Sequence, residues 1–146
     1  SELEGYRPGI KALEDSEVIS PYLDAKITKE EIRELARDRD LSVAEKASMA
    51  CLATRVPYGT KINHNLLKMV EAVENAVMEL FGIKCVRARH HGNLVRIEVG
   101  FNELQLMFNP DKLKHLEKIS REAGFTYITL DLRGYRTGAM DEGLNL

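Results

Sequence analysis

The sequence predicts an α+β fold in which residues 62–146 form a helix–strand–strand–helix–strand unit. Two runs of alternating residues, 84–90 and 94–99, flank a short His-Gly-Asn turn and predict a hairpin. Apolar residues at helical spacing precede and follow this hairpin, and a third alternating run at 125–132 ends the unit. We expect the three strands to form an antiparallel sheet with both helices on one face.

The first part of the chain carries weaker structural signals. Gly and Pro residues interrupt the segment 1–26, which predicts a loop with at most one short helix or strand. At Thr28 the hydroxyl can accept from the amide of Glu31 while the Glu31 carboxylate reaches back, which is a capping box. A helix is therefore predicted to begin there and to end at Arg39.

The two helices of the C-terminal unit have clear start and stop signals. Asn63 can cap the first helix, and Gly82 suits the left-handed conformation at its end. Asn109, followed by Pro110, begins the second helix, and Gly124 ends it. The apolar stripes expected to face the core are Leu66, Val70, Val73, Val77 and Leu80 in the first helix and Leu113, Leu116 and Ile119 in the second.

Composition excludes several classes of protein. The chain has 146 residues, of which 44% are hydrophobic, and its net charge is −2, so most of it is not disordered. The near balance of charge gives no general reason to expect a nucleic-acid partner, and no apolar run is long enough to span a membrane. Two cysteines do not form a disulfide framework, which predicts a reducing, cytoplasmic setting.

Charged residues gather on one face of the predicted hairpin. The face opposite the core carries Cys85, Arg87, Arg89, Arg96 and Glu98. Three guanidinium groups on one small face repel one another unless anions or carboxylates lie among them, and arginine binds phosphate through two hydrogen bonds. The face is therefore either a phosphate site or a solvated surface with Glu98 and Asp131 as ionic partners.

A long loop, residues 42–61, contains Cys51 between Lys46 and Arg55. Loops of this length in compact domains are usually functional or disordered. Cationic neighbours lower the pKa of a thiol and favour the nucleophilic thiolate. The alternative is that Cys51 is a small buried hydrophobic residue.

Metal binding is not expected from this sequence. Cys51 and Cys85 lack the paired spacing of a zinc site. His90 and His91 are neighbours, and adjacent side chains on a strand point in opposite directions, so joint ligation is awkward. We interpret both histidines as residues of the hairpin turn.

Four separated motifs resemble one known family. The loop Lys46–Thr60, KASMACLATRVPYGT, resembles the KPxxxCLxxRxPYGT signature of ATP-dependent sacrificial sulfur transferases, the LarE family of the PP-loop ATP-pyrophosphatase superfamily. The segments Tyr6–Gly9, Val86–Gly92 and Leu130–Gly138 match the same family in the same order. The helix at Thr28–Ala36 resembles a less specific segment shared by many PP-loop enzymes.

The resemblance implies an activity for the whole protein. Such enzymes use ATP and magnesium to adenylylate the carboxylate of a pyridinium nucleotide-like precursor of the nickel-pincer cofactor. A cysteine thiolate then displaces AMP, and cleavage of its own C–S bond leaves a thiocarboxylate product and dehydroalanine. By resemblance, Cys51 is the sulfur donor. The other implied site residues are Arg87, Arg89 and Arg136, which would bind substrate phosphate, and Lys46, Arg55, Glu98 and Asp131, which would support them.

Two departures from the family pattern matter. Ala47 replaces the Pro that usually follows the lysine, which is expected to loosen the loop. No SGGxDS-like sequence is present, although that loop binds the ATP phosphates in this superfamily, whose ATP domain is α/β. We therefore interpret residues 1–61 as the C-terminal remainder of the ATP domain and residues 62–146 as a small α+β domain.

Several expectations follow from this interpretation. The chain alone should be inactive and bind neither ATP nor magnesium, and the whole protein is expected to be a homo-oligomer. With a single cysteine in the loop, no iron–sulfur cluster is expected. The alternatives are a non-catalytic module that binds an anion or mediates oligomer contacts, and a PP-loop relative that acts on another carboxylate or on tRNA.

Overall fold

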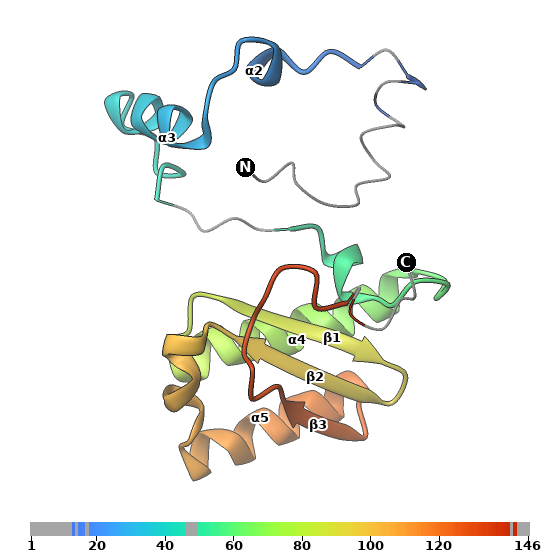
Figure 1. The fold of residues 1–146 in the computed structure, drawn as a ribbon. Coiled ribbons are helices and arrows are strands. Elements are labelled where there is room, and N and C mark those ends of the chain that lie inside the picture. The colour runs from blue at the N-terminus through green and yellow to red at the C-terminus, as the bar shows by residue number, and fades with distance from the viewer. Residues whose placement is uncertain (1–12, 14, 17, 46–49, 141, 143–146) are drawn as a thin grey trace. The chain divides into compact units, whose positions relative to one another are not determined.

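The computed structural model describes residues 13, 15, 16, 18–45, 50–140 and 142. The chain forms two compact units, Ser1–Lys46 and Ala47–Leu146. The first unit contains the helices α2 (Pro21–Asp24) and α3 (Lys29–Asp38), shown in Figure 1. The predicted boundary at residue 61 between two domains stays a prediction.

Helix α3 begins with the capping box that the sequence predicts. The Thr28 hydroxyl accepts from the amide of Glu31 at 3.3 Å, and the Glu31 carboxylate accepts from the amide of Thr28 at 2.7 Å. These hydrogen bonds satisfy amides that have no partner within the helix. They also lower the pKa of Glu31, mainly through the bond from the Thr28 amide. The helix ends at Asp38, one residue before the predicted end, and Arg39 is its C-terminal cap.

The second unit confirms the predicted α+β class and the predicted order of elements from residue 62 onward. A short 3-10 helix precedes that order and a second one interrupts it, and neither was predicted. The elements are η1 (Leu52–Arg55), α4 (His64–Phe81), β1 (Val86–His91), β2 (Leu94–Val99), η2 (Phe101–Met107), α5 (Pro110–Ala123) and β3 (Tyr127–Leu130).

The sheet has the order β1-β2-β3 and is mixed, not antiparallel. Strands β1 and β2 form the predicted antiparallel hairpin, in which Arg87 pairs with Glu98 and Arg89 with Arg96. Strand β3 pairs with β2 in parallel, so the expectation of an antiparallel third strand is wrong. The physical reason lies in the connection, because α5 carries the chain back across the sheet before β3 begins. A strand–helix–strand crossover of this kind returns the chain in the original direction.

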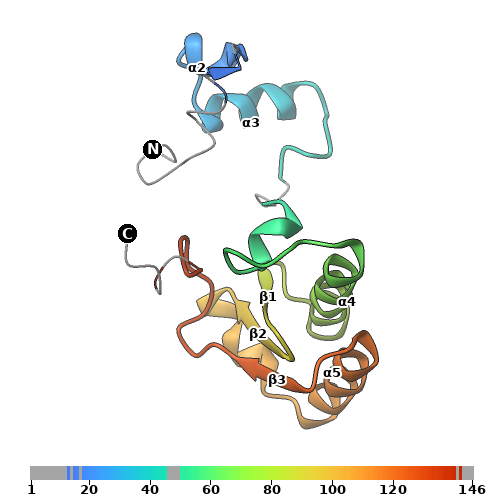
Figure 2. The ribbon, with the colours of Figure 1, turned by 90° about the vertical axis from the view of Figure 1, so that its right-hand side faces the viewer.

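Helices α4 and α5 cover one face of the sheet, as Figure 2 shows. Their caps are those predicted: Asn63 Oδ1 accepts from the amide of Leu66 at 2.9 Å, and Gly82 ends α4 with φ 70°. The core between the helices and the sheet includes Val70, Val73, Val77, Ala88, Val95, Ile97, Val99 and Leu116. The alternation in the hairpin therefore assigns the core face correctly.

The opposite face of the sheet is covered by residues 131–140, which we call the C-terminal strap (Figures 1 and 2). The strap follows β2, because the Asp131 amide donates to the Ile97 carbonyl at 2.8 Å and the Tyr135 amide donates to the Val99 carbonyl at 2.7 Å. Gly134 has φ +68°, and a Cβ there would lie 2.8 Å from the Val99 carbonyl oxygen. This close backbone approach requires glycine.

The strap changes the environment of the arginine face. Arg87 and Arg89 are 8% and 6% exposed, and Glu98 is fully buried. The alternative of a solvated face is therefore wrong, although its ionic partners, Glu98 and Asp131, were identified correctly. Contacts made by the strap and by η1, where Arg89 donates to the Thr54 carbonyl, remove this face from water.

Candidate functional site

Glu98 is the centre of an ion-pair network on the strap-covered face. One of its carboxylate oxygens accepts from Arg89 Nε at 3.0 Å and lies 2.9 Å from Arg89 Nη2, and the other accepts from Arg96 Nη2 at 3.0 Å. Both arginines come from the hairpin that the alternation predicted, and Arg89 and Arg96 lie opposite each other across the two strands. Their mutual repulsion is offset by the carboxylate placed between them.

The network continues into the strap through Asp131. Its carboxylate lies 3.7 Å from Arg96 Nε and accepts from Arg136 Nη1 at 3.1 Å, and Arg136 also donates to Glu142. Burial disfavours ionisation of Asp131, but hydrogen bonds from the Arg133 amide and Arg136 outweigh it and lower the pKa of this carboxyl. The strap is therefore held to the sheet by charged contacts as well as by backbone hydrogen bonds.

Arg87 lies under an aromatic ring of the strap. Its guanidinium carbon is 5.0 Å from the centroid of the Tyr135 ring, and its Nη1 donates to the Val86 carbonyl at 2.7 Å. Arginine stacks favourably on aromatic faces because the ring face carries negative charge density. Arg87 and Arg89 are thus on the same face, but they contact different parts of the chain.

The segment around Cys51 is anchored by a buried arginine. Cys51 itself is exposed and precedes η1. Arg55 is 1% exposed, and its Nε and Nη2 donate to the Glu74 carboxylate at 2.7 and 3.2 Å. Its Nη1 donates to the carbonyls of Ala50 and Cys51 at 3.2 and 3.3 Å. Arg55 therefore contacts the cysteine through its backbone, and the expected effect of Arg55 on the thiol stays a prediction.

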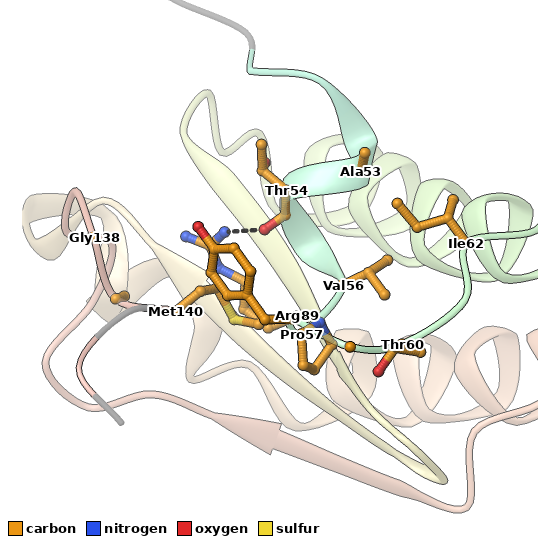
Figure 3. Close-up of a pocket in the computed structure, with 12 residues that line it drawn as sticks. Ala53, Thr54, Val56, Pro57, Thr60, Ile62, Arg89, Gly138 and Met140 are labelled. Atoms are coloured by element: carbon orange, nitrogen blue, oxygen red, sulfur yellow. Dashed lines mark hydrogen bonds between the residues drawn. The ribbon is translucent and has the colours of Figure 1, made fainter. Parts of the chain in front are cut away.

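A pocket of about 490 Å³ lies beside η1 (Figure 3). One wall is the segment Ala53–Thr60 with Ile62, the opposite wall is Gly138–Met140 of the strap, and Arg89 lies between them. The guanidinium of Arg89 donates to the Thr54 carbonyl at 3.0 Å, the dashed contact in Figure 3. Largely apolar walls with one charged group are typical of sites for small organic molecules, and the guanidinium favours an anionic one.

The structure places six of the eight predicted site residues around this pocket or its network. Arg89 lines the pocket, and Glu98, Asp131 and Arg136 extend from it through ion pairs. Cys51 and Arg55 belong to the segment that leads into the pocket wall. Arg87 lies on the same sheet face but contacts Tyr135. Lys46 and the Tyr6–Gly9 motif lie outside the described residues.

Sequence reasoning missed Glu74 and Tyr135. Glu74 lies four residues after Val70 and three before Val77, within the stripe of α4 that faces the core, and it is 6% exposed. A carboxylate in an apolar stripe requires a buried partner, and this signal could have identified it. Tyr135 carried no such signal, because its contact with Arg87 depends on the path of the strap.

The histidine pair has no metal-binding geometry in the described part of the chain, where no group of three His, Cys, Asp or Glu side chains could hold a metal ion. His90 belongs to β1 and pairs with Val95, so its ring faces the core, with its centroid 5.9 Å from that of Phe125. Burial lowers its pKa. His91 is exposed and is the last residue of β1, paired with Leu94. The interpretation of both histidines as turn residues is therefore wrong. Across the described residues no helix has the length and apolar character of a membrane span.

The two thiols are expected to differ in reactivity. Cys85 is partly buried, and burial raises the pKa of its thiol, although the nearby charge of Arg87 opposes this shift. Cys51 is exposed. Iodoacetamide at neutral pH should therefore alkylate Cys51 faster, by about tenfold or more, because the thiolate is the nucleophile.

Mass spectrometry of the two cysteine peptides measures both alkylation rates in one sample. In urea the two rates should become similar, since both thiols are then solvated. Equal rates in the folded protein would contradict the described environments of the two cysteines.

The fold and the site together define an α+β unit that anchors a cysteine-bearing segment beside an arginine-lined pocket. No protein-family model matches the chain. It is 34% identical over 141 residues to the pyridinium-3,5-bisthiocarboxylic acid mononucleotide synthase of Lactiplantibacillus plantarum, a match that covers 95% of this chain and 49% of that protein. This match supports the assignment to the LarE family that the motifs indicated.

Two further relatives are uncharacterized proteins. One, from Synechocystis sp., is 34% identical over 143 residues, which cover 98% of this chain and 53% of that protein. The other, from Methanocaldococcus jannaschii, is 30% identical over 131 residues, which cover 90% of this chain and 50% of that protein. The chain spans about half the length of the curated relatives it matches.

Proposed function

We propose that this chain is part of an ATP-dependent sulfur transferase that makes a thiocarboxylate on a pyridinium mononucleotide. The observation that carries the proposal is the exposed Cys51 directly before η1, a short helix whose residues Ala53 and Thr54 line the Arg89 pocket. The name of the Lactiplantibacillus plantarum synthase supplies the class of product. Together they favour a sulfur donor next to a site for an anionic substrate.

The proposed reaction uses Cys51 as the nucleophile and as the source of sulfur. The substrate carboxylate attacks ATP, which releases pyrophosphate and forms an acyl-adenylate. The Cys51 thiolate then attacks the acyl carbon, AMP leaves, and a thioester forms. Loss of the Cys51 Cα proton and cleavage of its Cβ–S bond release the thiocarboxylate and leave dehydroalanine.

ATP and magnesium would be bound by residues other than 1–146. The described helices α2 and α3 support the proposal that residues 1–61 belong to a larger ATP domain, because neither helix buries a residue. Their exposed apolar side chains include Tyr22, Leu23 and Leu35. An amphipathic helix is stable when its apolar stripe packs on another surface.

This division predicts the result of an ATP titration. Calorimetry of the 146-residue chain with ATP and magnesium should show no specific binding, because residues 1–146 contain no SGGxDS-like glycine-rich loop of the kind that binds ATP phosphates. The full-length protein is the positive control. Low-micromolar binding by the 146-residue chain would contradict the assignment of residues 1–61.

Arg89, with Arg87 and Arg136, is proposed to bind the substrate phosphate. The described contacts of Arg89 use three of its five N–H groups, two on Glu98 and one on Thr54, so further donors remain for an anion in the pocket. Such a contact is electrostatic and orients the substrate without taking part in bond breaking.

Replacing these arginines should weaken substrate binding in the full-length protein. Arg89→Ala or Arg87→Ala should raise the KM for the phosphorylated substrate roughly ten- to a hundredfold, because a charge-assisted hydrogen bond contributes about 1.5–3 kcal/mol. Arg121→Ala on α5 is the control, since Arg121 is an exposed arginine paired with Glu117. The dephosphorylated substrate is the second control, because its KM should not depend on these arginines. An unchanged KM for the phosphorylated substrate in both test variants would contradict the assignment of a phosphate site.

A further inference from the structure

A buried hydrogen-bond chain connects the core helix α4 to the backbone of Cys51. Glu74 is 6% exposed, and its carboxylate accepts from Arg55 Nε and Nη2. The same carboxylate accepts from the amide of Ala88 in β1 at 2.9 Å. Glu74 therefore connects three elements, α4, η1 and β1, through one side chain.

Arg55 links Glu74 to the backbone of Cys51 through hydrogen bonds. Its Nη1 donates to the carbonyls of Ala50 and Cys51 and to the Thr54 hydroxyl at 2.9 Å. The Cys51 carbonyl also accepts from the Thr54 amide at 3.0 Å and from the Thr54 hydroxyl at 2.8 Å. With Nη1 and both Glu74-facing nitrogens engaged, the planar guanidinium has little freedom to turn.

A second arginine holds the other side of the same turn. Arg89 donates to the Thr54 carbonyl, and Glu98 fixes Arg89 in turn. The segment from Ala50 to Arg55 is thus held from the sheet and from α4. Of these two arginines, however, the one whose described contacts include the carbonyl of Cys51 is Arg55, which Glu74 holds.

We infer that Glu74 is a positioning residue for Cys51, acting through Arg55. Its carboxylate sets the orientation of the Arg55 guanidinium, and the guanidinium sets the position of the Cys51 backbone. The exposed sulfur is thereby presented from a fixed turn, so the near-attack geometry is established before the substrate binds. The anchoring stands on the contacts alone, while its role in sulfur transfer rests on the proposed function.

Glu74→Gln in the full-length protein tests the anchoring. In the native protein one Glu74 oxygen accepts from both the Ala88 amide and Arg55 Nε, and the other accepts from Arg55 Nη2. The amide oxygen of glutamine can keep the first two contacts, but its NH₂ group then faces Arg55 Nη2. One hydrogen bond and the charge that holds the guanidinium are therefore lost. We expect amide hydrogen exchange in the peptide 50–56 to accelerate by about tenfold, beyond any change in β2. Glu79→Gln is the matched control, because Glu79 is an exposed residue of the same helix.

A second variant keeps the test informative if Glu74→Gln fails to fold. Arg55→Lys retains a charge for Glu74, but a single ammonium group cannot reach Glu74 and both carbonyls at once. It should therefore accelerate exchange in the peptide 50–56 in the same way. Two results would overturn the inference that Glu74 anchors this segment: an equal acceleration of exchange in the peptide 50–56 and in β2, or no acceleration in the peptide 50–56.

The positioning role has a kinetic signature. In both variants kcat for sulfur transfer should fall by about tenfold or more while the KM for ATP is unchanged, because only the nucleophile is misplaced. An unchanged kcat despite faster exchange would overturn the positioning role. A failure of the proposed function can be distinguished from a failure of this inference. If the proposed function is wrong, Cys51 of the unaltered protein keeps its sulfur during turnover.

Discussion

In the full-length protein supplied with ATP, magnesium and the pyridinium precursor, the peptide that contains Cys51 is expected to lose roughly 34 Da, the mass of H₂S. The loss follows from cleavage of the Cβ–S bond after thioester formation, which converts cysteine into dehydroalanine. Mass spectrometry after a single turnover measures the modified fraction. One mole of product should appear for each mole of modified peptide, because each cysteine donates one sulfur.

Cys85 is the internal control for this experiment. Its thiol is partly buried and its pKa is raised by burial, so its peptide should keep its mass. Cys51→Ala should still adenylylate the substrate, since that step precedes thiolate attack, but should transfer no sulfur. Full transfer by this variant, or a mass loss on Cys85, would refute the donor assignment.

Glu98→Gln is expected to destabilise the second unit strongly. Glu98 is fully buried and bridges Arg89 and Arg96, so removing its charge leaves a buried guanidinium without compensation. Breaking a buried ion pair in this way typically costs about 3–5 kcal/mol. Urea denaturation followed by circular dichroism should show a lower midpoint with little change in slope.

An exposed ion pair provides the comparison for Glu98. Glu117 pairs with Arg121 on α5, and both side chains are about half exposed. Glu117→Gln should lower the free energy of unfolding by less than about 1 kcal/mol, because water screens surface pairs. Equal effects of the two substitutions would show that the strap does not keep Glu98 away from solvent.

Most of the second unit could be predicted because its signals are local. Asn63, Gly82 and Asn109 mark helix ends through hydrogen bonds and backbone conformations within a few residues of the chain. Period-two alternation likewise assigned the two faces of the hairpin. The orientation of β3 was mispredicted even though its sequence neighbourhood, a helix between two strands, already favoured a parallel pair.

The candidate site could be predicted only in part. The cysteine motif and the arginine alternation identified Cys51, Arg87 and Arg89 as residues of interest. Whether Arg89 is solvated or buried depends on η1 and on the strap, and both lie more than thirty residues from Arg89 along the chain. Glu74 was missed for a similar reason, since its partners Arg55 and Ala88 lie 19 and 14 residues away.

The sequence by itself determined the main helices and strands of the second unit, the core face of the hairpin and the family resemblance, because each depends on short-range periodicity or on a contiguous motif. Only the tertiary structure decided which charged side chains form ion pairs and how far each pair is exposed to solvent. Glu98 is buried between Arg89 and Arg96, and the strap that lies over this face approaches β2 closely at Gly134. Ion pairing depends on distance and burial, and both are set by segments that meet only after folding.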